Sequence, residues 1–249
     1  MSAQSHQPRE RGLLDTRLAW MHEGTRFFDA RVGQLADDDF HAPAALPRWT
    51  RAHVVAHVAR NADALGNLLT WARTGVETQM YESGEQREAD IEEGATRPAA
   101  VLRADLEDAQ RRFAAAVASL PAEAWRAEVR TRAGRPIAAA EVPWMRAREV
   151  WVHAVDLDAG ASFADLPPSF VEAFLTEVTA TFTARPDCGA IELVATDTGR
   201  TWSIGPPDAD EVVVEGGAGA LLAWLLGRSD GAVLSAPGRG VLPAVPSWL

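Results

Sequence analysis

The sequence of 249 residues contains no lysine, so all 24 of its basic residues are arginines. The absence of lysine excludes catalysis through a Schiff base on the protein, including covalent pyridoxal-phosphate chemistry, and it excludes a phosphate-binding loop that needs a lysine. The 35 acidic residues outnumber the basic ones and give a formal net charge of -11. No run of basic residues interrupts this excess, and we therefore expect no nucleic-acid partner.

Cysteine and long hydrophobic runs are also scarce. The single cysteine, Cys188, cannot form an internal disulfide, which is typical of proteins in a reducing compartment. The longest apolar stretch, residues 218–226, is far too short to cross a bilayer, and the N-terminus lacks the apolar core of a signal peptide. We therefore expect a soluble, cytoplasmic protein with no membrane partner.

The remaining composition is that of a globular protein, with 47% hydrophobic residues. Apolar residues recur at helical spacing in four long segments. These segments are residues 13–35, 51–73, 98–120 and 139–158. Four such helices predict an antiparallel four-helix bundle. We expect residues 1–11 to form a disordered tail, and the polar segment 76–97 to form an irregular loop, longer than a typical bundle connection.

The pattern changes after residue 162. An amphipathic helix is expected over residues 168–185, and the segments IELVA and TWSIG, joined by the turn-forming TDTGR, predict a β-hairpin. EVVVEGG predicts a third strand and AGALLAWLLGR a short helix. The predicted fold class is therefore a helical bundle domain over residues 12–162 joined to a smaller α+β domain over residues 163–249.

Two of the expected helices carry side chains that can bind a metal. Glu149 and His153 lie four residues apart, so they can point at one place, and His57 lies in the apolar stripe of the second helix, with His53 nearer its edge. Two imidazoles and one carboxylate form the ligand set of a catalytic zinc site, with Asp156 available to accept a hydrogen bond from an imidazole. The same spacings also fit a solvated ion pair and a buried structural histidine, so the residues alone leave these alternatives open.

Three segments carry a resemblance to a known family. RWTRAHVVAHVARNADALGNLLTWARTG, YESGEQREADIEEGA and MRAREVWVHAVDLDAG together resemble the mycothiol-dependent maleylpyruvate isomerases. The C-terminal run that begins GGAGALLAWLLGRSDG and ends LPAVPSWL is similar to the second domain of that family, so the resemblance covers nearly the whole chain. It implies a DinB-like, metal-binding four-helix bundle joined to a small C-terminal α+β domain.

The resemblance also implies roles for individual residues. It implies a divalent metal, usually zinc, held by His57, Glu149 and His153. It further implies a catalytic arginine in the second domain, for which the best match is Arg228 in LLGRSDG, with Arg200 in TDTGR as a competing basic group.

The reaction implied by the resemblance is the isomerisation of maleylpyruvate to fumarylpyruvate with mycothiol as cofactor. An external thiolate adds to the double bond, allows rotation and leaves, and the metal favours the thiolate. Two substrate carboxylates require fixed positive charge, which arginine must supply here; Arg228 is the first candidate and Arg87 of the polar segment the second. Cys188 is expected to be structural.

Two other functions fit the same residues. A metal-dependent mycothiol S-transferase would use the same three ligands to conjugate the thiol to an electrophile. A non-catalytic small-molecule-binding module would keep the bundle without the reaction. For either enzyme the expected partners are a small-molecule substrate and the thiol cofactor, and we expect the protein to be a monomer.

Overall fold

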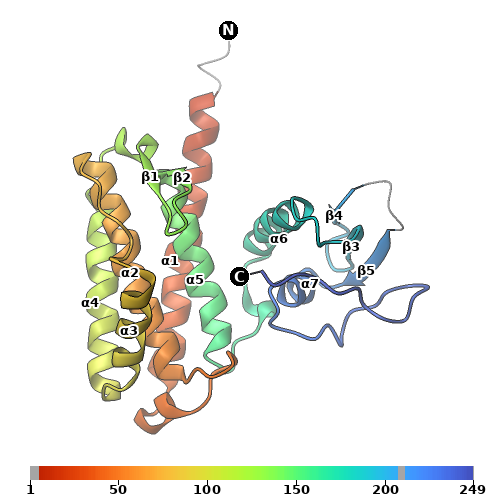
Figure 1. Ribbon diagram of the computed structural model, residues 1–249, viewed down its shortest axis with the longest axis horizontal. Coiled ribbons are helices and arrows are strands. Elements are labelled where there is room, and N and C mark those ends of the chain that lie inside the picture. The colour runs from red at the N-terminus through yellow and green to blue at the C-terminus, as the bar shows by residue number, and fades with distance from the viewer. Residues whose placement is uncertain (1–5, 207–210, 249) are drawn as a thin grey trace. The chain divides into compact units, whose positions relative to one another are not determined.

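The chain divides into two units, residues 1–161 and 162–249, in a computed structural model that describes residues 6–206 and 211–248. Four long helices build the first unit (Figure 1). These are α1 (His6–Gln34), α2 (Arg51–Thr74), α4 (Ala99–Ala118) and α5 (Val142–Asp156). The predicted fold class, a helical bundle followed by a smaller α+β unit, is confirmed.

Helix α2 packs against α3, α4 and α5 and contributes many of the buried residues of the bundle. It begins after Thr50, whose backbone N–H donates to Nδ1 of His53 (3.1 Å), so a side chain of the first turn satisfies a backbone group at the helix start. It ends before Gly75, whose φ of 72° lies in the left-handed region that glycine adopts without strain. Local signals in the sequence therefore set both ends of this helix.

The directions of the helices differ from the expected antiparallel arrangement. Arg60 pairs with Asp105 (2.7 Å) and, further along both helices, Asp63 pairs with Arg112 (2.7 Å). Residue numbers thus increase in the same direction along both helices, so α2 and α4 run parallel to each other. Helices that are parallel and neighbouring need a connection that returns along the bundle, and residues 75–98 provide it (Figure 1).

This returning segment contains a helix where an irregular loop was expected. Helix α3 (Gly84–Ala95) starts at Ser83, whose hydroxyl caps its first turn. Its apolar periodicity is weak because few of its residues are buried, Ile91 being the largest. A Cβ atom at Gly94 would lie 2.8 Å from the Cβ of Ala56, so α3 packs closely on α2.

The N-terminal tail is shorter than expected, because α1 begins at His6 and residues 6–11 are helical. Pro8 does not prevent this, since the first-turn amides of a helix have no intrahelical partner. Residues 1–5 lie outside the described part of the chain. Short elements complete the first unit: η1 (Asp37–His41), η2 (Ala124–Arg126), β1 (Glu128–Arg130), β2 (Pro136–Ala138) and η3 (Ala139–Glu141).

The second unit is a three-stranded sheet with two helices packed on it. Its elements are η4 (Phe163–Asp165), α6 (Pro168–Thr183), β3 (Ile191–Ala195), β4 (Thr201–Ile204), β5 (Val212–Gly216) and α7 (Ala218–Leu225). The strand order is β4-β3-β5, with β3 and β4 forming the predicted hairpin and β5 parallel to β3. Helix α6 packs against β4, and α7 against β3 and β5. Among the described residues, no helix is both long and apolar enough to cross a membrane.

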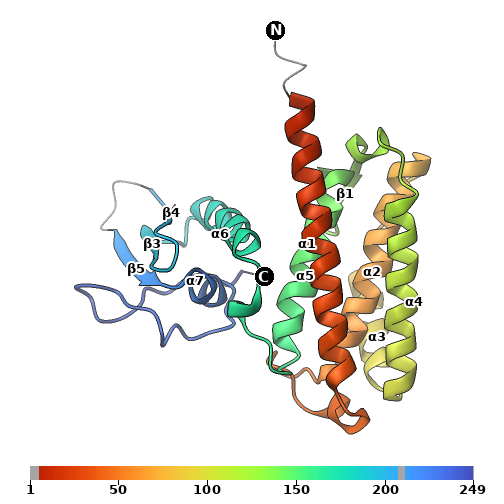
Figure 2. The ribbon, with the colours of Figure 1, turned by 180° about the vertical axis from the view of Figure 1, so that it is seen from behind.

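Helices α1 and α5 lie side by side (Figure 2), and we expect them to pack so closely at Gly24 of α1 that no larger residue fits there. A Cβ atom there would lie 2.7 Å from both Trp151 Nε1 and Val150 Cγ2. Gly24→Ala should therefore lower the free energy of unfolding by about 1–3 kcal/mol in urea denaturation. The control is Gly12→Ala in the same helix, where nothing lies within 4 Å and the better helix propensity should add about 0.5–1 kcal/mol. Equal stability of the two variants would contradict the close approach.

Candidate functional site

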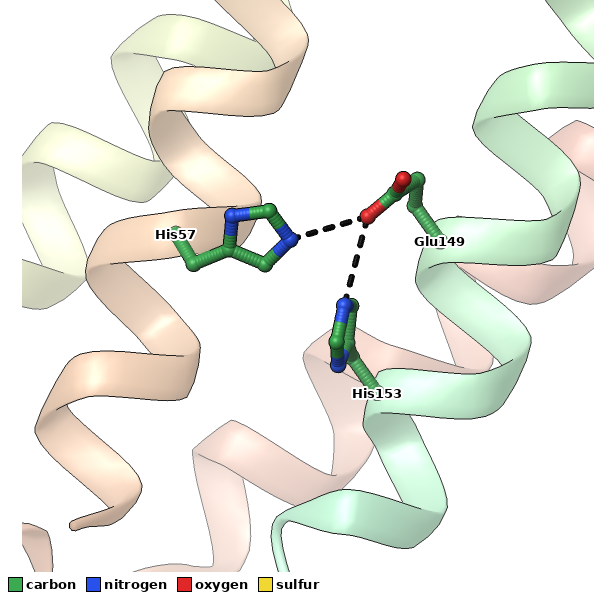
Figure 3. A group of neighbouring side chains, drawn as sticks. All are labelled: His57, Glu149 and His153. Atoms are coloured by element: carbon green, nitrogen blue, oxygen red, sulfur yellow. Dashed lines mark hydrogen bonds and ion pairs between the residues drawn. The ribbon is translucent and has the colours of Figure 1, made fainter. Parts of the chain in front are cut away.

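The side chains of His57, Glu149 and His153, hereafter the triad, meet between α2 and α5 (Figure 3). Oε2 of Glu149 lies 2.9 Å from Nε2 of His57 and 3.2 Å from Nε2 of His153. The two imidazole rings are 4.6 Å apart and nearly perpendicular. One potential ligand atom from each residue lies within 4.8 Å of the other two. The structure thus brings together the three residues selected from the sequence.

A buried arginine holds α2 and α5 in the register that the triad needs. Arg146 precedes Glu149 by one turn, and its Nη1 donates to the backbone oxygen of Val58 and to Oδ1 of Asn61, both at 2.8 Å. Its side chain is only 1% exposed, and burial lowers the pKa of Arg146 to about 10, so it remains charged at neutral pH. No motif in the sequence singles out Arg146; its place on the buried face of α5 is the one available signal.

His153 is oriented by Asp156, as the spacing suggested. Its Nδ1 lies 2.9 Å from Oδ2 of Asp156, which is fully buried. Because a carboxylate only accepts, the proton of this bond belongs to Nδ1, and Nε2 is directed to Glu149. Burial by itself would lower the pKa of His153, but the hydrogen bonds to Asp156 and Glu149 raise it to about 9.

The pKa values of the other two members of the triad are lowered, in contrast to that of His153. Burial lowers the pKa of His57, which is 5% exposed, and this effect exceeds that of its hydrogen bond to Glu149. Burial alone would raise the pKa of Glu149, but hydrogen bonds from His153 and His57 hold it well below its usual range. At neutral pH the triad therefore contains a neutral His57, an ionised Glu149 and a charged His153.

His53 lies one turn before His57 but has partners of its own. Its Nδ1 is 2.7 Å from Oγ1 of Thr50 at the start of α2, and its Nε2 is 3.3 Å from Oε2 of Glu92 in α3. These contacts use both ring nitrogens outside the triad. The position near the edge of the apolar stripe, inferred from the sequence, corresponds to this role at the helix start.

The returning segment also brings Arg87, the second candidate arginine, to the triad. Nη2 of Arg87 lies 3.1 Å from Nδ1 of His57, and its Nη1 pairs with Glu88. The guanidinium carbon is 5.7 Å from the centre of the Tyr81 ring. The centre of the Trp49 ring is 5.6 Å from that of the His57 ring. An aromatic ring and a cation therefore both lie close to the same imidazole.

The remaining predicted residues lie in the second unit. Nη1 of Arg228, just after α7, donates to the backbone oxygen of Leu226 (2.9 Å), and its catalytic role stays a prediction. The competing Arg200 pairs with Glu172. Cys188 is buried, and burial raises the pKa of its thiol, which makes it a weak nucleophile at neutral pH.

The triad has the donor atoms and the spacing that a divalent metal requires. Nitrogen and oxygen ligands about 2.1 Å from a tetrahedral zinc ion lie roughly 3.4 Å from one another. The observed separations of 2.9 and 3.2 Å from Glu149 Oε2 to the two imidazoles are close to this value. The bond from His153 Nδ1 to Asp156 directs Nε2 of that ring to the same point. Three protein ligands would leave one position of a tetrahedral ion for a further ligand.

Comparisons with known proteins find similarity along nearly the whole chain. Residues 21–158 match the family model described as the mycothiol maleylpyruvate isomerase N-terminal domain, and residues 165–246 match the MDMPI C-terminal domain. Two similar crystal structures are those of the mycothiol-dependent maleylpyruvate isomerase and of a histidine-to-alanine mutant. Each is 35% identical with a TM-score of 0.89, and the match covers 94% of this chain and 97% of the other. A search of curated proteins found no match.

In chelator-treated protein, we expect His153 to make stability fall as the pH rises from about 6.5 to about 9. Its pKa is raised from 6.5 to about 9 on folding, so its contribution is complete below the lower value and is lost as the pH passes the upper one. The loss is on the order of 3 kcal/mol. The pKa of His57 is lowered from 6.5 on folding, so the change in stability that the titration of His57 causes falls below this pH range.

Urea unfolding at several pH values across this range measures the effect. His153→Gln should flatten the pH dependence, whereas the control His53→Gln should keep it, because His53 contacts Thr50 and Glu92 instead. The same slope in both variants would mean that groups other than His153 cause it.

Proposed function

The chain belongs to the mycothiol-dependent maleylpyruvate isomerase family, and from this premise we propose that it isomerises maleylpyruvate to fumarylpyruvate with mycothiol as cofactor. The observation that carries the proposal is the convergence of His57, Glu149 and His153 between α2 and α5. Membership of the family makes the chain an isomerase. In this proposal the triad is the site at which the thiol is activated.

We propose that the triad holds a divalent metal and that the metal is zinc, which two imidazoles and one carboxylate suit. A metal bound there supplies a Lewis acid that favours the thiolate form of a neighbouring thiol. Glu149 contributes the negative charge of the ligand set. Asp156 keeps one proton of His153 on Nδ1, so that the other proton leaves from Nε2 when that nitrogen binds a metal. Arg146 donates hydrogen bonds to two residues of α2 and thereby fixes the position of α2 along α5, next to Glu149.

The thiol must come from outside the chain. Cys188 is the sole cysteine, and burial suppresses its ionisation. An external thiol such as mycothiol therefore supplies the nucleophile that permits rotation about the double bond. Arg228 is our proposed catalytic arginine in the second unit, supported by its match to the family motif. The cytoplasmic location and the monomeric state stay predictions.

The proposal predicts about one zinc ion per chain in protein purified without chelator. Elemental analysis should find this zinc in the wild type and in the control His53→Gln, and should find none in His57→Gln. The two variants make the same change one turn apart on α2, and His57 belongs to the triad whereas His53 contacts Thr50 and Glu92. Isomerisation of maleylpyruvate in the presence of mycothiol should fall by at least about 100-fold in His57→Gln alone, because the metal site is lost.

Two results would contradict this assignment. A folded wild-type protein without metal would remove the triad from the mechanism. A zinc-loaded protein that converts an electrophile and mycothiol into a stable thioether, while leaving maleylpyruvate unchanged, would identify an S-transferase instead. Recovery of free mycothiol after turnover is the result expected for the isomerase.

A further inference from the structure

Arg87 occupies an unfavourable place for a cation, because its guanidinium lies beside a residue of the proposed metal site. Nη2 is 3.1 Å from Nδ1 of His57, and the Arg87 side chain is only 18% exposed. Its ion-pair partner Glu88 is 61% exposed, so that pair is a weak compensation. A guanidinium this close repels a divalent cation held by His57, and the Glu149 carboxylate, itself a proposed ligand, is the anion of the triad that offsets this repulsion.

The fold nevertheless holds Arg87 at the triad. Ser83 caps the first turn of α3, which carries Arg87, and the close contact of Gly94 with Ala56 keeps α3 against α2. The ring of Tyr81 lies 5.7 Å from the guanidinium carbon, and its hydroxyl oxygen accepts a hydrogen bond from the Arg87 side chain. The place of the guanidinium is therefore built by several contacts within the first unit.

The hydrogen bond between Arg87 and His57 is incompatible with a metal on the same imidazole. A guanidinium carries donors only. An imidazole that binds a metal through Nε2 keeps its proton on Nδ1, so Nδ1 can no longer accept a bond from Arg87. In the metal-binding form of His57, Nη2 of Arg87 thus faces the triad with a donor that an incoming acceptor can satisfy.

We propose that this acceptor is a carboxylate of the substrate, so that Arg87 is a substrate-binding residue contributed by the first unit. The inference rests on the proposed function, in which the substrate is a dicarboxylate. The planar fork of arginine matches the two oxygens of a carboxylate, and the chain has no lysine to take this role. The bound carboxylate also shields the metal from the guanidinium, so carboxylate and metal should each strengthen the binding of the other.

Calorimetric titration of zinc-loaded, full-length protein tests the proposal. The probe is succinylpyruvate, the saturated analogue of maleylpyruvate, which has both carboxylates but no double bond to isomerise. Arg87→Gln should weaken its binding roughly 10- to 100-fold, the range for a lost hydrogen bond to a charged group. Arg87→Lys should restore part of the loss, because it keeps the charge without the fork. The control Arg97→Gln, just beyond α3, removes an arginine paired with Glu93 and should bind as the wild type does.

A second measurement separates ligand binding from support of the fold. In chelator-competition titrations, Arg87→Gln should bind zinc at least as tightly as the wild type, whereas a structural arginine would weaken the metal site when removed. Succinylpyruvate should tighten zinc binding in the wild type and leave it unchanged in Arg87→Gln. In turnover, the variant should raise the KM for maleylpyruvate without changing the KM for mycothiol.

The outcomes distinguish this inference from the proposed function. Wild-type affinity for succinylpyruvate in Arg87→Gln, or weaker zinc binding in that variant, would overturn the role of Arg87 and leave the isomerase intact. A zinc-loaded wild type that neither binds succinylpyruvate nor isomerises maleylpyruvate would overturn the proposed function, and the role of Arg87 with it.

Discussion

The carboxylate of Glu149, held between imidazoles from two helices, is the interaction on which the site depends. An ionised carboxylate between packed helices is stable only when opposite charge and hydrogen bonds compensate for its lost hydration. His57 and His153 supply the hydrogen bonds, and Arg146 supplies charge one turn away on the same helix. The arrangement requires α2 and α5 to keep a fixed register, since a small slip would separate the triad.

The topology of the bundle explains why its longest connection lies at this site. Helices α2 and α4 are parallel neighbours, so the chain must return along the bundle between them. Residues 75–98 make this return, and α3 packs on α2 as they do so. Arg87 and Glu92 consequently reach the imidazoles of His57 and His53. A connection that closes the topology thus also completes the surroundings of the triad.

Much of the local structure could be predicted because its causes lie within a few residues. The ends of α2 follow from Thr50 and Gly75, and the β3–β4 hairpin follows from alternation around a turn. The convergence of Glu149 and His153 follows from the helical repeat. Helix α3 was missed for the complementary reason, since so little of it is buried that its sequence shows no clear apolar stripe. The start of α1 was misplaced because polar residues with good helix propensity look the same in a frayed tail and in an exposed turn.

The sequence by itself determined the four long helices of the first unit, the helices and strands of the second, the fold class, the family resemblance and the residues of the triad. Periodicity, turn chemistry and motif spacing depend on residues that are close together in the chain. Only the tertiary structure decided the parallel direction of α2 and α4, the cross-link from Arg146 to α2 and the meeting of Arg87 with His57. These three features join residues that are distant in the chain. Their energies depend on which helices pack together, and no local pattern in the sequence records that choice.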